Sequence, residues 1–271
     1  MLSPTTESLI ARVTTGRRAE RLVAILDLVS ERGTVALADI SDELGISAAT
    51  ARRDLSDLAD QNLIVRTHGG ASALERGSEI PVALRDTRFQ EAKRLIARAM
   101  VRRLPSERYV VALSGGTTTA SVARALANPR DITVVTNSLT IANLLSGYAG
   151  VRVAMTGGFL RPQSLELVGA LAESTFNAVN VGTAILGADG ISATAGVTTH
   201  DETEARTNRA MVAKAQRTVV VADGSKIGNV ALAQMAEVGQ VEMLITDSSA
   251  DPTELEKLRE AGIQIVLADE E

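Results

Sequence analysis

The chain has 271 residues, a formal net charge of −5, no cysteine, and 45% hydrophobic but only 2% aromatic residues. The missing cysteines exclude disulfides and zinc–thiolate sites, and the acidic balance argues against a general polyanion binder. We find no basic-then-apolar signal pattern and no apolar run near the ~18 residues of a membrane span, so we expect a soluble, cytoplasmic protein without a membrane partner.

The N-terminal part of the chain has the pattern of short helices after a polar segment, residues 1–16, that we expect to fray. A first helix is predicted to end at Gly33 and a second at Gly45, and Val35 favours a short strand between them. The predicted buried stripes of these two helices are Leu22, Ile25, Leu26 and Val29, and Leu37, Ile40 and Leu44.

A third helix follows, with Ser47 as a suitable N-cap. Its predicted buried stripe is Ala51, Leu55 and Leu58. The other face carries polar and basic side chains in the first two turns, the part of a recognition helix that reaches base edges in the major groove: Ser47, Thr50, Arg52 and Arg53.

The segment after this helix predicts a two-stranded wing, with strands over residues 63–66 and 71–74 and a tight turn at residues 67–70. Arg66, Thr67 and His68 are then placed to meet the sugar–phosphate backbone. The pattern alone leaves an alternative open, a three-helix module that binds protein, with Arg52 and Arg53 on a solvated face.

Charge gives this interpretation little general support, because residues 1–78 hold nine arginines against eleven acidic residues. DNA binding must therefore depend on where the arginines sit: Arg17, Arg18 and Arg21 before the first helix, Arg52 and Arg53 on the third, and Arg66 on the wing. Homodimerisation would double the phosphate contacts, so we expect a homodimer or a higher homo-oligomer.

Residues 75–88 separate this DNA-binding module, residues 17–74, from a second domain, residues 89–269. The stretch from Glu75 to Arg85 lacks periodicity and contains Gly77 and Pro81, which indicates a linker. A longer helix is predicted from about Arg85, with these apolar residues in register: Phe89, Ala92, Ile96, Ala99, Met100 and Leu104.

The second domain alternates short β-branched runs with helical segments, one of which begins at Asp251-Pro252. Continuous apolar strands between helices predict an α/β fold with a mainly parallel sheet covered on both faces. The runs are Tyr109–Leu113, Ile132–Val135, Val151–Met155, Val179–Leu186, Thr218–Ala222, Met243–Thr246 and Ile263–Leu267.

Ligands of open α/β sheets bind outside the carboxyl ends of the strands, and a glycine- and threonine-rich loop follows the first strand of this domain. Backbone amides and hydroxyls where such a loop opens a helix favour an anion. An ordinary βα turn is an equal alternative, because the loop is neither a Walker loop nor a GxGxxG fingerprint. The candidate residues are Gly115, Gly116, Thr117, Thr118 and Thr119.

Four polar residues at later strand ends are further candidates: Asn137, Arg161, Asp189 and Lys226. Each also has an ordinary explanation, namely a helix cap, a surface arginine, a turn and a chance lysine. Lysine is rare in this arginine-rich chain, with four among 28 basic residues, which suggests that a compact ammonium is needed at Lys226.

Motifs in both parts closely resemble the DeoR (deoxyribose operon repressor) family, over about residue 17 to the C-terminus. In the first part they are Ile46-Ser47, Thr50, Arg52–Leu55, Leu58, Leu63 and Arg66–Ala71. In the second they are Ser114–Thr119, Val134–Ala142, Gly157–Arg161, Leu167–Gly169, Gly187–Ile191, Gly196–Thr199, Glu204-Ala205, Arg209–Met211, Ala222–Lys226 and Leu244–Asp247.

This resemblance implies a winged helix-turn-helix joined to a sensor domain with a fold similar to ribose-5-phosphate isomerase. The function implied is a regulator, expected to be a repressor, of a carbohydrate-metabolism operon that binds operator DNA and a phosphorylated sugar or related effector. Carried over by position, Gly115–Thr119 and Lys226 would hold the phosphate, and Asn137, Arg161, Asp189 and Glu204 would face the rest of the effector.

The chain departs from the family pattern at Ser114-Gly115, where Asp-Ser is usual, and at Asn208, where lysine is common. The alternative function is a sugar-phosphate isomerase or transferase with an appended DNA-binding module, for which Asp189 and Glu204 are candidate bases. The sequence lacks the second aspartate of the isomerase pattern in Gly187–Gly190, so we expect no catalytic residues, and likewise no cofactor and no metal site.

Overall fold

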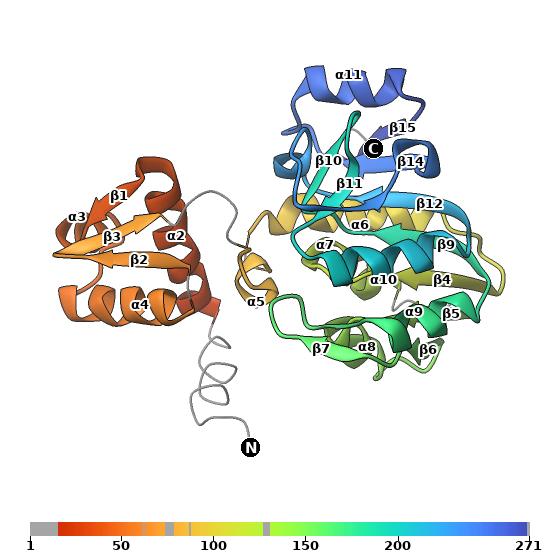
Figure 1. Cartoon of the computed structure of the whole chain (residues 1–271), viewed down its shortest axis with the longest axis horizontal. Helices are drawn as coiled ribbons and strands as arrows, with labels where there is room; N and C mark the ends of the chain where they lie inside the picture. The colour runs from red at the N-terminus through yellow and green to blue at the C-terminus, as the bar shows by residue number, and fades with distance from the viewer. Residues whose placement is uncertain (1–15, 62, 74–78, 87, 127–130, 270–271) are drawn as a thin grey trace. The chain divides into compact units, whose positions relative to one another are not determined.

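The computed structural model describes residues 16–61, 63–73, 79–86, 88–126 and 131–269. These fall into two compact units that divide between Arg88 and Phe89 (Figure 1). The polar segment expected to fray lies outside the described residues, except for Gly16. Among the described residues, no helix is both long enough and apolar enough to cross a membrane.

The N-terminal unit has the predicted winged helix-turn-helix architecture. Its helices are α2 (Gly16–Arg32), α3 (Leu37–Glu43) and α4 (Ala48–Asp60). Its strands are β1 (Thr34–Ala36), β2 (Ile64–Thr67) and β3 (Gly70–Ala73), which form an antiparallel sheet in the order β1-β3-β2. The predicted stripes of the first and third helices are all buried in the core of this unit, which confirms both helices.

The segment expected to be a linker is partly structured. Helix α5 (Val82–Arg85) packs on α2, and Leu84 is 1% exposed in the same core. The helix predicted to start near Arg85 begins instead at Gln90, as α6 (Gln90–Arg102). Phe89, which was expected in the buried stripe of this helix, has a left-handed φ of 53° and is 47% exposed. A left-handed residue cannot continue an α-helix, so the helix begins only after Phe89.

The second unit is built on one seven-stranded parallel sheet in the order β15-β14-β12-β9-β4-β5-β6 (Figure 1). Each of the seven predicted runs forms one of its strands, which confirms the predicted parallel sheet. The strands are β4 (Tyr109–Leu113), β5 (Ile132–Thr136), β6 (Val151–Met155), β9 (Val181–Leu186), β12 (Ala215–Val221), β14 (Met243–Thr246) and β15 (Gln264–Leu267).

Both faces of this sheet are covered, and β4 shows the alternation: Val111 and Leu113 belong to one core cluster and Ala112 to the other. Helices α6, α7 (Thr117–Leu126) and α8 (Leu139–Leu145) contribute to the first cluster. Helices α9 (Ala170–Asn177), α10 (Glu202–Val212) and α11 (Pro252–Glu260) contribute to the second.

Within the described part of the second unit, five short strands lie outside this sheet and are not among the predicted elements. Strands β7 (Phe159–Arg161) and β8 (Glu166–Val168) form an antiparallel hairpin, in which Arg161 pairs with Glu166. Strands β10 (Gly190–Ser192), β11 (Gly196–Thr199) and β13 (Ala233–Ala236) form a second small sheet.

The order in which strands are added to the large sheet reverses between β4 and β9, which are themselves parallel. The chain runs outward from β4 to β5 and β6, and then returns to place β9 on the other side of β4. In open parallel sheets such a reversal leaves a crevice at the carboxyl ends of the two strands. The loops there begin at Ser114 and Gly187, and the Gly187 N–H donates to Ser114 Oγ over 3.0 Å.

Candidate functional site

The N-terminal end of α4 presents the residues expected to read DNA. Ser47 caps the helix by accepting the Thr50 N–H at 3.2 Å, and the two hydroxyl oxygens lie 2.9 Å apart. Arg52 and Arg53 are exposed on the following turn. The cap therefore fixes the start of a helix whose exposed face carries two guanidinium groups.

The wing is a two-residue hairpin, with His68 and Gly69 between strands β2 and β3. Arg66, Thr67 and His68 are all exposed. Arg66 Nη1 donates to Ser56 Oγ of α4 over 2.8 Å, so the base of the wing is tied to the helix. The remaining guanidinium donors of this exposed side chain can still meet a phosphate.

The arginines expected ahead of the first helix have a different place. They lie within α2, where Arg21 Nε and Nη2 donate to Asp54 over 2.5 and 3.1 Å, and Arg18 pairs with Asp57. This hydrogen-bonded pair raises the pKa of Arg21. Arg18 and Arg21 thus hold α4 against α2, while the side chain of Arg17 lies outside the described residues.

In the second unit, the glycine-rich loop joins β4 to α7 at the reversal point. Gly116 has φ +123°, a conformation that L side chains rarely adopt, and its carbonyl accepts the Thr119 hydroxyl at 3.0 Å. Thr117 is half-buried, and Thr118 and Thr119 are buried. The loop thus opens α7 with the amides of its first residues at a helix N-terminus, where an anion is favoured.

Asn137 and Arg161 lie at or beside the same ends of the strands. Asn137 Nδ2 donates to the Leu167 carbonyl over 3.2 Å, while its Oδ1 is buried and lacks a hydrogen-bond partner among the described residues. Arg161 lies on β7 rather than directly after the third strand, and it forms ion pairs with Asp201 at 3.4 Å and Glu204 at 3.3 Å.

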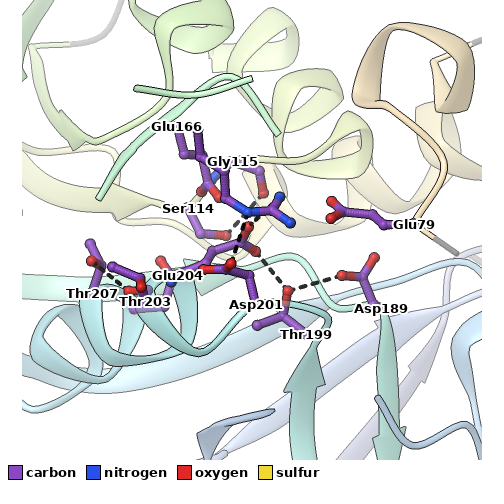
Figure 2. A network of polar contacts seen from close by, with 12 residues as sticks. Glu79, Ser114, Gly115, Glu166, Asp189, Thr199, Asp201, Thr203, Glu204 and Thr207 are labelled. Carbon is purple, nitrogen blue, oxygen red and sulfur yellow. Dashed lines mark hydrogen bonds and ion pairs between the residues drawn. The ribbon is translucent and has the colours of Figure 1, made fainter. Parts of the chain in front are cut away.

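Asp189 and Glu204 meet at one hydroxyl (Figure 2). Thr199 Oγ1 lies 3.0 Å from Asp189 Oδ2 and 2.7 Å from Glu204 Oε1. Asp201 caps α10 by accepting the Glu204 N–H at 2.9 Å. Three carboxylates (Asp189, Asp201 and Glu204) and one arginine therefore share a largely buried polar network at the carboxyl ends of the strands.

Glu166 completes this network and is absent from the sequence-predicted residues. It is 1% exposed on β8, and its Oε1 accepts the Gly115 N–H at 2.5 Å (Figure 2). Burial, and then the nearby charge of Glu204, raise the pKa of Glu166 well above its ordinary value. Burial likewise raises the pKa of Glu204.

Lys226 ends a short 3-10 helix, Gly224–Lys226, after β12. It is half-buried, and none of the described residues forms an ion pair or hydrogen bond with its ammonium group. Strand β9 lies between β12 and β4, so the lysine loop and the glycine-rich loop are two strand spacings apart, about 10 Å.

Family models match both parts of the chain. The DeoR-like helix-turn-helix domain matches residues 21–76, and the DeoR C-terminal sensor domain matches residues 88–248. The chain belongs to the DeoR family.

Curated DeoR-family relatives align over nearly the whole chain. A putative aga operon transcriptional repressor of Escherichia coli O157:H7 is 35% identical, over 93% of this chain and 94% of its own. The glycerol-3-phosphate regulon repressor of Escherichia coli K12 is 31% identical, over 93% and 99%. Ribose 5-phosphate isomerase A of Methanocaldococcus jannaschii superposes with a TM-score of 0.39 and 18% identity, over 51% of this chain and 54% of its own.

The two departures from the DeoR pattern have structural counterparts. A Cβ atom on Gly115 would lie 2.4 Å from three atoms of the Glu166 side chain, so Glu166 fills the space that a serine there would need. Asn208 is 1% exposed on α10, its Nδ2 donates to Met235 Sδ, and its Oδ1 is buried without a hydrogen-bond partner among the described residues. Glu166 could not be recognised from sequence, because a glutamate flanked by two leucines ordinarily faces water.

Proposed function

We propose that this protein is a repressor of a carbohydrate-metabolism operon whose DNA affinity is set by a phosphorylated sugar or related metabolite. The family supports DNA binding, and the two relatives described are named as repressors, of the aga operon and of the glycerol-3-phosphate regulon. Operator DNA would be read by Arg52 and Arg53 of α4, while Arg66, Thr67 and His68 of the wing hold the backbone.

The observation that carries the effector proposal is the position of the glycine-rich loop. It lies at the reversal point of a parallel sheet and opens α7 with Gly116 in a left-handed conformation, so that the backbone amides of the first residues lie at a helix N-terminus. Such loops bind phosphate because the donors converge and the helix dipole favours negative charge. Lys226, a half-buried residue, would supply the compensating positive charge.

The polar network beside this loop fits the hydroxylated end of a sugar. Carboxylates and an amide oxygen accept hydrogen bonds from hydroxyl groups, and Arg161 can donate to an oxygen. Asn137 Oδ1 is one such acceptor that lacks a partner among the described residues. In this proposal, Asn137, Arg161, Asp189 and Glu204 face the sugar and the loop holds its phosphate.

A thermal-shift screen of the full chain against sugar phosphates tests this proposal. A ligand at 100 times its Kd adds about 2.7 kcal/mol of stability, which raises the melting temperature measurably. The hit should also change operator affinity in a gel shift. Lys226→Ala should abolish both responses while leaving ligand-free DNA binding intact.

Lys257→Ala is the matched control, since Lys257 is an exposed lysine paired with Glu254 on α11. Its response should equal that of the wild type. A Lys226→Ala protein with wild-type effector affinity would show that the phosphate binds elsewhere. Conversion of ribose 5-phosphate by the wild type would instead favour the alternative function, a sugar-phosphate isomerase with an appended DNA-binding module.

A further inference from the structure

The contact between Glu166 and Gly115 joins two segments that are 51 residues apart. Glu166 comes from the hairpin β7–β8, and Gly115 lies in the loop between β4 and α7. The Gly115 N–H donates to Glu166 Oε1 over 2.5 Å, and the glutamate is almost fully buried. A backbone amide of the candidate phosphate loop therefore already binds a carboxyl group of the protein itself.

The fit of this carboxyl group is close. A Cβ atom at position 115 would lie 2.4 Å from Glu166 Cγ, Cδ and Oε1, a distance that real Cβ contacts essentially never show. The glutamate therefore occupies the space directly against the Gly115 backbone. An anion from solution can reach this amide only after the Glu166 side chain has moved.

The surroundings make this position costly for a carboxylate. Glu166 is out of water, and the charge of nearby Glu204 opposes its ionisation. Two neighbouring buried carboxyl groups disfavour each other's charge. The cation of the network, Arg161, forms ion pairs with Asp201 and Glu204.

We propose that Glu166 is an internal competitor of the effector: it holds the Gly115 amide in the ligand-free protein and is displaced when the anionic group of the effector takes that amide. Glu166 then sets the effector affinity without binding the effector. This inference rests on the proposed function, since it requires the loop after β4 to bind the phosphate.

A supporting role and a competing role for Glu166 predict opposite changes in anion affinity when the side chain is removed. A glutamate that merely supports the loop would weaken anion binding when it is removed. A competitor strengthens anion binding when it is removed, because the amide and the space beside it become free. Inorganic phosphate and a panel of sugar phosphates, titrated calorimetrically into the full chain, provide the measurement.

Glu166→Ala should bind phosphate and the best sugar phosphate at least tenfold more tightly than the wild type. Glu166→Gln keeps a carbonyl oxygen on the Gly115 amide but removes the charge, so its gain should be only a few-fold. Glu256→Ala, which removes an exposed glutamate of α11, should leave both affinities unchanged. Circular dichroism of each variant confirms that it is folded.

Equal gains in anion affinity for Glu166→Ala and Glu166→Gln would overturn the proposal that Glu166 competes for the Gly115 amide. Removal of charge repulsion alone would then explain both gains. Unchanged or weaker binding by a folded Glu166→Ala protein would overturn it as well; if the wild type still binds a sugar phosphate, the proposed function stands. Should Glu166→Ala fail to fold, a Glu166→Gln protein without any gain overturns the inference. Absence of binding by the wild type and by every variant would overturn the proposed function too.

Discussion

The buried carboxyl pair, Glu166 and Glu204, makes the stability of the second unit depend on pH. Because burial raises both pKa values, the folded protein binds protons that the unfolded chain releases. Stability is therefore greatest near the ordinary pKa of glutamate and falls as pH rises through the window above it, by about 1.4 kcal/mol per pH unit for each proton.

Glu166→Gln should remove most of this dependence, since glutamine imitates the protonated carboxyl group at every pH. Urea unfolding of the second unit between pH 5 and pH 8 provides the test. We expect the variant to be the more stable protein at pH 8 and to have the flatter profile. If the stabilities of the wild type and the variant changed with pH in the same way, the folded Glu166–Glu204 pair would hold no extra proton.

At the DNA surface, Arg53 and Arg66 should differ in what they recognise. Arg53→Ala, on the exposed face of α4, should cost roughly 1–3 kcal/mol of operator binding and blur the base preference. Arg66→Ala should weaken operator and unrelated DNA alike and reduce the salt dependence, since it is placed to meet phosphate. Gel shifts over a salt series distinguish these outcomes.

Arg98→Ala controls for the lost charge, because Arg98 is exposed on α6 of the second unit. It should bind DNA as the wild type does. If neither Arg53→Ala nor Arg66→Ala changed operator affinity, the prediction that α4 and the wing bind DNA would be wrong.

Among the elements, α2 has a specific part in holding α4. Asp54 is 2% exposed and receives two hydrogen bonds from Arg21, so Arg21→Ala leaves a buried carboxylate without its main partner. We expect a loss of about 2 kcal/mol, below the usual buried-pair value because Arg21 is itself partly exposed. Operator affinity should also fall, although Arg21 lies on α2 and not on the DNA-reading face.

Chemical denaturation of the N-terminal unit measures this loss. Arg32→Ala is the control, since the Arg32–Glu43 pair is exposed and worth at most about 1 kcal/mol. The double change Arg21→Met with Asp54→Leu should recover most of the stability. If Arg21→Ala lost no more stability than Arg32→Ala, the buried Asp54 carboxylate would not depend on Arg21.

The elements with a strong local signal could be predicted from sequence. The apolar stripes of α2 and α4 and the seven β-branched runs were sufficient for both folds. The hairpin β7–β8 was not predicted, because its strands have three residues each and no periodicity. Glu166 was missed with it, since its burial depends on a contact with Gly115 that only the tertiary fold creates.

At the scale of the whole molecule, the distribution of charge favours an oligomer. Arg18 and Arg21 are paired with aspartates of α4, so that among the described side chains of one module Arg52, Arg53 and Arg66 are the arginines placed for DNA. Each phosphate contact contributes about 0.9 to the slope of log K against log salt. If all three arginines met phosphates, the slope would be about 3 for one module and about 5 for a dimer, so a single module cannot exceed a slope of about 3 through these arginines.

Light scattering at micromolar concentration should therefore report at least twice the chain mass of 28.4 kDa. The salt slope of operator binding should lie near the dimer value, and the operator half-sites should be related by two-fold symmetry. A monomer with and without DNA, combined with a slope near 3, would contradict this expectation.

The collision between a Cβ atom at position 115 and the side chain at position 166 also constrains how this chain can change. A larger residue at 115 cannot coexist with Glu166 in its present position, so a change at 115 requires either that the glutamate side chain moves or that residue 166 is replaced. Grafting a loop with serine at 115 onto this protein should consequently push Glu166 off the backbone amide of residue 115, unless a smaller residue at 166 is introduced in the same step.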